Sequence, residues 1–151
     1  MATVPPIEVT VQSSELAVRE ALGKLLDKLS PLDLGTEEAG KVEMVLAEVL
    51  NNIVEHAYPD QNAAGRIAIS CAHRPDGLHL RIVDEGEAMP GGNAPLGVQA
   101  SLDVDLNDLP EGGFGWFLIH TLAKDVKYQR IGLENQLSMR LAVALTNESG
   151  C

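Results

Sequence analysis

The chain has 151 residues, 22 of them acidic and 11 basic, which gives a formal net charge of −11. This length fits a single domain spanning residues 1–151 with a core of ordinary size. The acidic balance disfavours a nucleic-acid or anionic-membrane surface, because proteins that bind phosphate backbones normally present clustered lysine and arginine. A nucleotide can still bind if a metal ion and backbone amides supply the positive field.

Cysteine usage and the first residues indicate a reducing compartment. The two cysteines, Cys71 and Cys151, form neither a disulfide framework nor a zinc-ligand spacing. The N-terminus lacks a basic region followed by an apolar core, and no run of about 18 apolar residues occurs. These features predict a soluble, cytoplasmic protein that contacts neither membrane nor nucleic acid directly.

The first part of the chain predicts one strand followed by two helices. Residues 7–12 alternate apolar and polar side chains, which is the period of a half-buried strand. Residues 15–29 carry apolar residues at helical spacing, and one of the two preceding serines is expected to cap them. A second helix is expected to open with Thr36 as its cap and to run, with a buried apolar face, to about Tyr58.

The second helix carries a polar column on one flank. Glu48, Asn52 and His56 follow one another at steps of four, so they lie beside the apolar face rather than opposite to it. A column in this place either borders a cleft or is an ordinary solvated flank. The helix alone leaves both interpretations open.

The second half of the chain predicts four more strands, a long loop and a third helix. The strands are expected at residues 66–73, 78–84, 126–130 and 136–145. One of them runs directly into Asp84-Glu85-Gly86, which in isolation is more typical of an ordinary strand-ending turn. The loop at residues 88–112 is too long for a simple connection and has no basic residue, so an anion held there needs a cation.

The glycine-rich segment Gly112-Gly113-Phe114-Gly115 ends this loop, and an amphipathic helix follows from Trp116. A glycine-rich turn that opens a helix exposes backbone N–H groups at the positive end of the helix dipole, where phosphates bind. The segment matches neither the P-loop nor the Rossmann fingerprint, and alone it is equally compatible with a flexible hinge.

In their order along the chain, these three segments resemble the motifs of the GHKL ATP-binding family, in particular its bacterial anti-sigma-factor serine kinases. Glu48-Val-Leu-Asn-Asn52 is similar to the family's N box, Asp84-Glu-Gly86 to its first glycine box and Glu111-Gly-Gly-Phe-Gly115 to its second. The resemblance covers residues 7–145. It implies an α/β (α+β) two-layer sandwich of Bergerat type, in which a mixed, mostly antiparallel sheet of about five strands carries three helices on one face.

The resemblance also implies the ligands and the residues that bind them. Asn52 would hold Mg²⁺ through its side-chain oxygen, and the ion would bridge the phosphates of ATP. Asp84 would accept a hydrogen bond from the adenine amino group. Gly86 would let the base approach the backbone, and Met89 would pack near the base.

Around the phosphates, the resemblance gives Gly112, Gly113, Phe114 and Gly115 a cofactor-binding role, in which backbone amides meet the phosphates while residues 88–112 close as a lid. Glu48 would be the general base that orients a protein serine hydroxyl or a water for attack. His56 would have a structural role.

The implied function is a kinase-type switch that binds a sigma factor and phosphorylates a serine of an antagonist protein with MgATP. Homodimerisation is a further family expectation, with the strand at residues 7–12 and the first helix as one possible dimer face.

Three departures from the family pattern bear on this function. Ala88 stands where the first glycine box often has a second glycine, and Glu55 stands where the neighbouring sensor histidine kinases often have a basic residue. Pro110-Glu111 stands where some serine kinases have Arg or Lys. A non-catalytic, ATP-gated binding module of the same fold therefore stays open, as does a metabolic α/β protein without a nucleotide.

Overall fold

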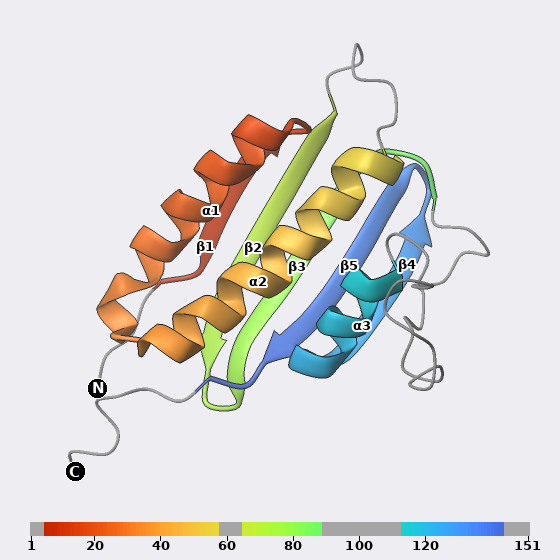
Figure 1. Ribbon diagram of the computed structural model, residues 1–151. Helices are drawn as coiled ribbons and strands as arrows, with labels where there is room; N and C mark the ends of the chain where they lie inside the picture. Colours follow the sequence, from red (N-terminus) through yellow and green to blue (C-terminus); the bar gives the residue numbers. More distant parts are fainter. Residues whose placement is uncertain (1–4, 58–64, 89–112, 144–151) are drawn as a thin grey trace.

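The computed structural model describes residues 5–57, 65–88 and 113–143 (Figure 1). Within this part of the chain the elements are β1 (Ile7–Gln12), α1 (Glu15–Leu29), the 3₁₀ turn η1 (Ser30–Leu32), α2 (Thr36–Asn52), the π-helical turn η2 (Ile53–Ala57), β2 (Arg66–Arg74), β3 (Gly77–Asp84), α3 (Gly113–Leu122), β4 (Lys124–Ile131) and β5 (Glu134–Leu141).

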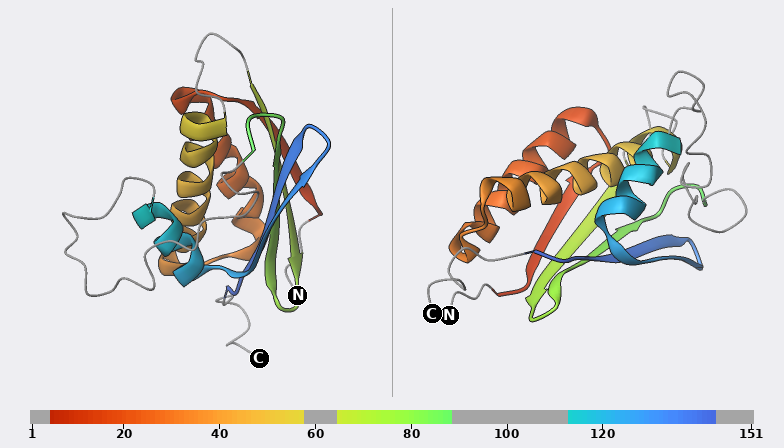
Figure 2. Two further views of the ribbon diagram at one scale, coloured as in Figure 1. Left: turned by 90° about the vertical axis from the view of Figure 1, so that its right-hand side faces the viewer. Right: turned by 60° about the horizontal axis from the view of Figure 1, so that its bottom comes forward.

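The strands form one sheet of five strands in the order β1-β2-β3-β5-β4, and α1, α2 and α3 cover one of its faces (Figures 1 and 2). This confirms the expected two-layer α+β sandwich. Every pairing between described strands is antiparallel, so the sheet is more regular than the mixed one expected. The reason lies in the connections: β2-β3 and β4-β5 are hairpins, and the two helices between β1 and β2 return the chain in the opposite direction.

The core lies between the helices and the sheet. In α2 and η2 the apolar positions expected on the inner face are all buried, namely Val42, Val45, Leu46, Val49, Ile53 and Ala57. Leucine and isoleucine side chains from every described strand except β4 meet them, and burial of each such side chain contributes about 1.5–3 kcal/mol. No helix among the described residues is both long enough and apolar enough to cross a bilayer.

Local signals set most element ends. The bounds of β1 and α1 are those expected, and Ser14 caps α1 by accepting a hydrogen bond at Oγ from the backbone N–H of Ala17 at 3.1 Å. The expected cap of α2 is wrong: Gly35 is the cap residue, in extended conformation, and Thr36 is already helical. The third helix begins at Gly113, three residues before the predicted Trp116, so the glycine-rich segment forms its first turn.

Candidate functional site

Two of the three motif segments meet at one end of the sandwich, and the third lies beside α2. The C-terminal end of α2 with η2 and the end of β3 lie at the same end of the molecule, whereas the first turn of α3 lies further down, alongside α2 (Figures 1 and 2). A direct contact joins the first two, because the backbone N–H of Glu87 donates a hydrogen bond to the carbonyl of Ala57 at 2.8 Å. The fold therefore brings the segments that carry Asn52 and Asp84 together and packs α3 against α2 next to them.

The polar column of α2 is regular only as far as Asn52. Glu48 and Asn52 lie four residues apart within the α-helix, so they are neighbours on one flank. After Asn52 the backbone widens into the π-helical turn η2, and such insertions recur at functional sites. His56 lies within η2, so the step of four is not kept there, and its side chain lies outside the described residues.

Asn52 has an unsatisfied polar group. Its side chain is half-buried, its Nδ2 is fully buried, and Nδ2 finds no hydrogen-bond partner among the described residues. A buried amide without a partner costs about 1–3 kcal/mol, so such a group in a folded protein indicates a partner beyond the described residues. Glu48 is likewise half-buried.

Asp84 ends β3 on the helix-facing side of the sheet and is only 4% exposed. Its Oδ1 accepts two hydrogen bonds, from the backbone N–H of Gly86 at 2.9 Å and from Nδ2 of Asn135 at 2.7 Å. Both donors converge on one oxygen. Its Oδ2 accepts none within the described ranges, so this oxygen remains available as an acceptor.

Burial raises the pKa of Asp84, because a charged carboxylate loses solvation in the protein interior. The hydrogen bonds from Asn135 and Gly86 and the positive charge of Arg130 oppose this shift without cancelling it. The result is a buried carboxylate with a fixed orientation, which is the requirement for reading a hydrogen-bond donor on a ligand.

Asn135 is the main site residue that the sequence did not reveal. It lies directly opposite Asp84 on the neighbouring strand β5 and is also 4% exposed. Besides the bond to Asp84, its Nδ2 donates to the carbonyl of Glu87 at 2.8 Å. Asn135 thus fixes both the carboxylate and the backbone that follows it.

Two residues of β4 complete this network. Arg130 lies opposite Asn135, and its Nη1 donates to Asn135 Oδ1 at 3.0 Å and to the carbonyl of Gly86 at 2.6 Å. The hydroxyl of Tyr128 donates to the same Asn135 oxygen. The segment after β3 is therefore fastened to β5 and β4 by side chains.

Gly86 is required where the end of β3 passes η2. A Cβ atom at this position would lie 2.3 Å from the carbonyl oxygen of Ala57 and 2.7 Å from its Cβ. No real Cβ tolerates such contacts without a backbone shift. The resemblance gave this glycine a role toward the base, and the structure gives it a second one, the close contact between two motif segments.

The remaining predicted site residues lie around α3 or outside the described part. Gly113, Phe114 and Gly115 form the first turn of α3, where backbone N–H groups lack intrahelical partners and the helix dipole is positive. Met89 and Gly112 lie outside the described residues, as do residues 89–111 of the expected lid.

These residues fit a nucleotide and, with it, a magnesium ion. A buried carboxylate with a free oxygen suits the amino group of adenine, and a helix N-terminus suits a phosphate. Within the described ranges no three His, Cys, Asp or Glu side chains cluster to hold a metal by themselves. Mg²⁺ does not need such a cluster, because it is commonly bound by one or two protein oxygens together with phosphates and waters.

Comparison with known proteins gives a consistent result. The family model of the histidine kinase-like ATPase domain matches residues 11–141. Serine-protein kinase RsbW of a Bacillus cereus strain is 31% identical over 87 residues, which are 57% of this chain and 53% of that protein. Serine-protein kinase RsbW of Oceanobacillus iheyensis is 29% identical over 132 residues, 84% of this chain and 80% of that protein. The chain thus spans about half the length of the Bacillus cereus relative.

A solved structure has the same fold. The RsbU and RsbW domains of Rv1364c from Mycobacterium tuberculosis superpose with a TM-score of 0.62 over 94% of this chain and 34% of that one, at 16% sequence identity. At this identity the likeness concerns the arrangement of helices and strands, which agrees with the family match.

Proposed function

We propose, from the premise that this chain belongs to the histidine kinase-like ATPase domain family, that residues 1–151 form one ATPase domain acting as an anti-sigma-factor serine kinase. In this proposal the protein binds MgATP, transfers the γ-phosphate to a serine of an antagonist protein and sequesters a sigma factor in the cytoplasm. The observation that carries the ATP-binding part is the buried, oriented carboxylate of Asp84 at the end of β3, where the chain contacts the turn η2 that follows Asn52.

Asp84 is the residue proposed to recognise adenine. Its Oδ1 is held by Gly86 and Asn135, and Oδ2 accepts the hydrogen bond of the adenine amino group. Guanine carries a carbonyl oxygen in place of that amino group and would face the carboxylate with like partial charge. The proposal therefore includes a preference for ATP over GTP, because a buried carboxylate left against an acceptor is costly.

Asn52 and the first turn of α3 are proposed to hold the phosphate side of the nucleotide. The buried, unpartnered amide of Asn52 supports this assignment, since a bound ligand would supply the missing partner. Its carbonyl oxygen would coordinate Mg²⁺, which neutralises phosphate charge when bound. Gly113, Phe114 and Gly115 would offer backbone N–H groups, and Gly112 and Met89 keep the binding roles that the family resemblance implies.

Glu48 is the proposed general base. It lies one helical turn before Asn52 on the same flank, so it would reach a hydroxyl placed next to the metal-bound phosphate. A carboxylate in that place would accept the proton of the attacking serine and orient its oxygen.

The second candidate is a non-catalytic module in which ATP binding selects a protein partner without phosphotransfer. The stretch between Arg81 and Lys124 favours it, because it contains no lysine or arginine to stabilise charge on the transferred phosphate. Both candidates share the nucleotide site, and homodimerisation is compatible with either.

Calorimetric titration with ATP and GTP, with and without Mg²⁺, tests the shared site. Asp84→Asn and Asn52→Ala are each expected to weaken ATP binding by about tenfold or more, since each removes one polar contact with the ligand. Glu43→Ala, an exposed carboxylate on the same helix, is the matched control and should bind normally. Equal affinity in all variants, or equal binding of GTP, would contradict the proposed site.

Phosphotransfer separates the two candidates. With a cognate antagonist and MgATP, the kinase predicts a phosphoserine product that Glu48→Ala abolishes while its ATP affinity is unchanged. The binding module predicts ATP-dependent partner binding and no phosphoprotein. Transfer that survives in Glu48→Ala removes this residue from the mechanism.

A further inference from the structure

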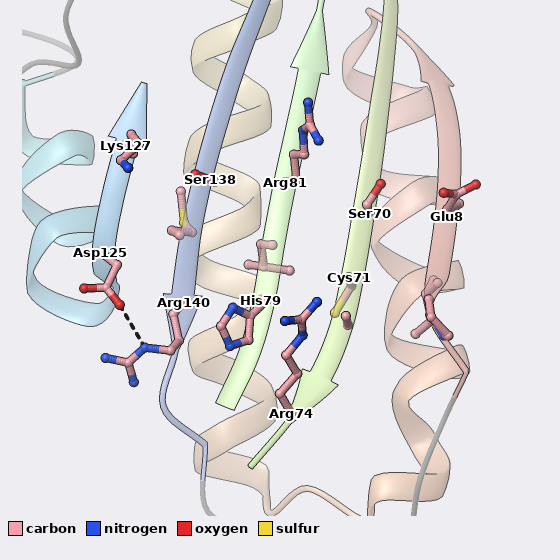
Figure 3. A pocket seen from close by; sticks show the side chains of 15 residues that line it. Glu8, Ser70, Cys71, Arg74, His79, Arg81, Asp125, Lys127, Ser138 and Arg140 are labelled. Carbon is pink, nitrogen blue, oxygen red and sulfur yellow. Dashed lines mark hydrogen bonds and ion pairs between the residues drawn. The ribbon is translucent and has the colours of Figure 1, made fainter. Parts of the chain in front are cut away.

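The face of the sheet opposite the helices is uncovered in the described part of the chain, and it differs in charge from the protein as a whole. Side chains from all five strands line a hollow of about 430 Å³ on this face (Figure 3). Four basic residues, Arg74, Arg81, Lys127 and Arg140, line it together with only two acidic ones, Glu8 and Asp125. The chain overall has twice as many acidic as basic residues, so this face is a local reversal of charge.

Strand register explains why the hollow exists. Ser70, Arg81, Ser138 and Lys127 occupy neighbouring positions across β2, β3, β5 and β4, so they form one cross-strand row. The two serines are short and leave space on either side of Arg81. Neighbouring strands lie about 4.8 Å apart, which places the backbone positions of Arg81 and Lys127 about 10 Å from each other.

Most of this positive charge is not neutralised by the protein itself. Arg140 is paired, because its Nε lies 3.1 Å from Asp125 Oδ2 and 3.7 Å from Asp76 Oδ2. Among the described residues, the guanidinium of Arg81 donates only to the neutral side chain of Gln136, at 2.7 Å. The side chains of Arg74 and Lys127 have no hydrogen bond or ion pair with any residue in the described ranges.

We propose that this basic hollow docks an acidic segment of a partner protein. Carboxylates of the segment would bind Arg81 and Lys127, with the Ser70 and Ser138 hydroxyls as additional donors. In a segment with polyproline II conformation, carboxylates three residues apart lie on the same side and about 9 Å from each other, which matches the spacing of the two cations. Arginine suits this role because its guanidinium binds a carboxylate through two parallel hydrogen bonds.

The site is independent of the proposed ATP site, because it lies on the other face of the sheet and shares no residue with it. A second copy of this chain is a weaker occupant, since two molecules of net charge −11 repel each other over the rest of their surfaces. An acidic partner segment gains from the local charge without requiring the two whole proteins to approach closely.

The test is fluorescence anisotropy of a labelled octaglutamate peptide titrated with the full chain at low and physiological salt. Binding is expected to weaken with salt, and the double variant Arg81→Glu/Lys127→Glu is expected to lose about tenfold or more in affinity. The matched control, Lys24→Glu/Lys28→Glu, makes the same change in net charge on exposed positions of α1 and should bind like the wild type. Asp84→Asn should also bind normally, which separates this site from the ATP site.

Three outcomes would overturn the proposal. An equal loss of peptide affinity in the α1 control would show that binding depends on the net charge of the protein and not on this face. Tighter binding of an RNA oligonucleotide of the same length, lost in the same double variant, would assign the face to nucleic acid. Self-association of the wild type that the double variant abolishes, measured by analytical ultracentrifugation, would assign the face to a second copy.

Discussion

Strands β3, β5 and β4 carry two polar rows on opposite faces of the sheet. The inner row is Asp84, Asn135 and Arg130, and the outer row, three residues away along each strand, is Arg81, Ser138 and Lys127. The inner row has one carboxylate and one guanidinium joined by an amide that bonds both. The outer row has two cations separated by a serine and no carboxylate.

The difference between the two rows shows how burial determines which polar residues a row can contain. Asp84 and Asn135 are each 4% exposed, so their polar atoms must find partners within the protein, and they do. The charged side chains of the outer row remain in contact with solvent, so their charges need no partner within the protein. The polar groups of the inner row are therefore held in place by one another, whereas the two cations of the outer row stay accessible.

The largest effect is expected where the inner row meets η2. Gly86→Ala should lower the free energy of unfolding by about 3 kcal/mol, because the new methyl group would overlap the Ala57 carbonyl. Gly23→Ala in α1 is the matched control: nothing lies within 4 Å of its added Cβ, and it should stabilise the protein by about 1 kcal/mol. Urea unfolding followed by circular dichroism measures both. A Gly86→Ala protein as stable as the wild type would show that η2 and β3 can separate without cost.

A smaller loss is expected at the centre of the inner row. Asn135→Ala should cost about 2 kcal/mol, since it removes one acceptor of Arg130 and one of Tyr128 and takes a donor away from Asp84. Ser138→Ala, at the centre of the outer row on the same strand, should stay within about 0.5 kcal/mol of the wild type. An equal loss of stability in the two variants would mean that the buried inner row contributes no more to the free energy of unfolding than the exposed outer row.

The sequence predicted best what is decided locally. The strand at residues 7–12 and the helix at residues 15–29 were predicted to the residue, because alternation, helical spacing and a serine cap act within a few positions. The motif segments at Asn52 and Asp84 were also found from local pattern. Their convergence at one edge was expected only from the family resemblance, and the fold agrees with it.

What the sequence did not reveal depends on strand register and on contacts between distant segments. Asn135 was placed outside its strand, which was expected to begin at residue 136, and nothing local shows that it faces Asp84. Arg130 and Tyr128 were interpreted only as members of an alternating strand. The sequence did not predict the widening of α2 into η2 either, because the apolar spacing continues unchanged through Ile53 and Ala57.

A third effect concerns pH on the inner row. Because the folded state raises the pKa of Asp84, it binds the proton more tightly than the unfolded chain does. As pH falls through the raised pKa toward the ordinary value of Asp, this residue therefore adds stability to the folded protein. The free energy of unfolding of the wild type, relative to Asp84→Asn, should rise over that window in urea titrations at a series of pH values. A flat difference would contradict the raised pKa.

The smallest effect is expected at the exposed turn between β2 and β3, next to the outer face, and it has the opposite sign. The hydrogen bond from His79, at 2.6 Å, lowers the pKa of the exposed Asp76. This carboxylate contributes stability above its ordinary pKa, and the contribution is lost as pH falls through the lowered folded value. The wild type relative to Asp76→Asn should thus lose stability on acidification, by little, because solvent screens the pair. If the stability differences relative to Asp84→Asn and to Asp76→Asn changed in the same direction with pH, burial would not explain the opposite pKa shifts of the two carboxyl groups.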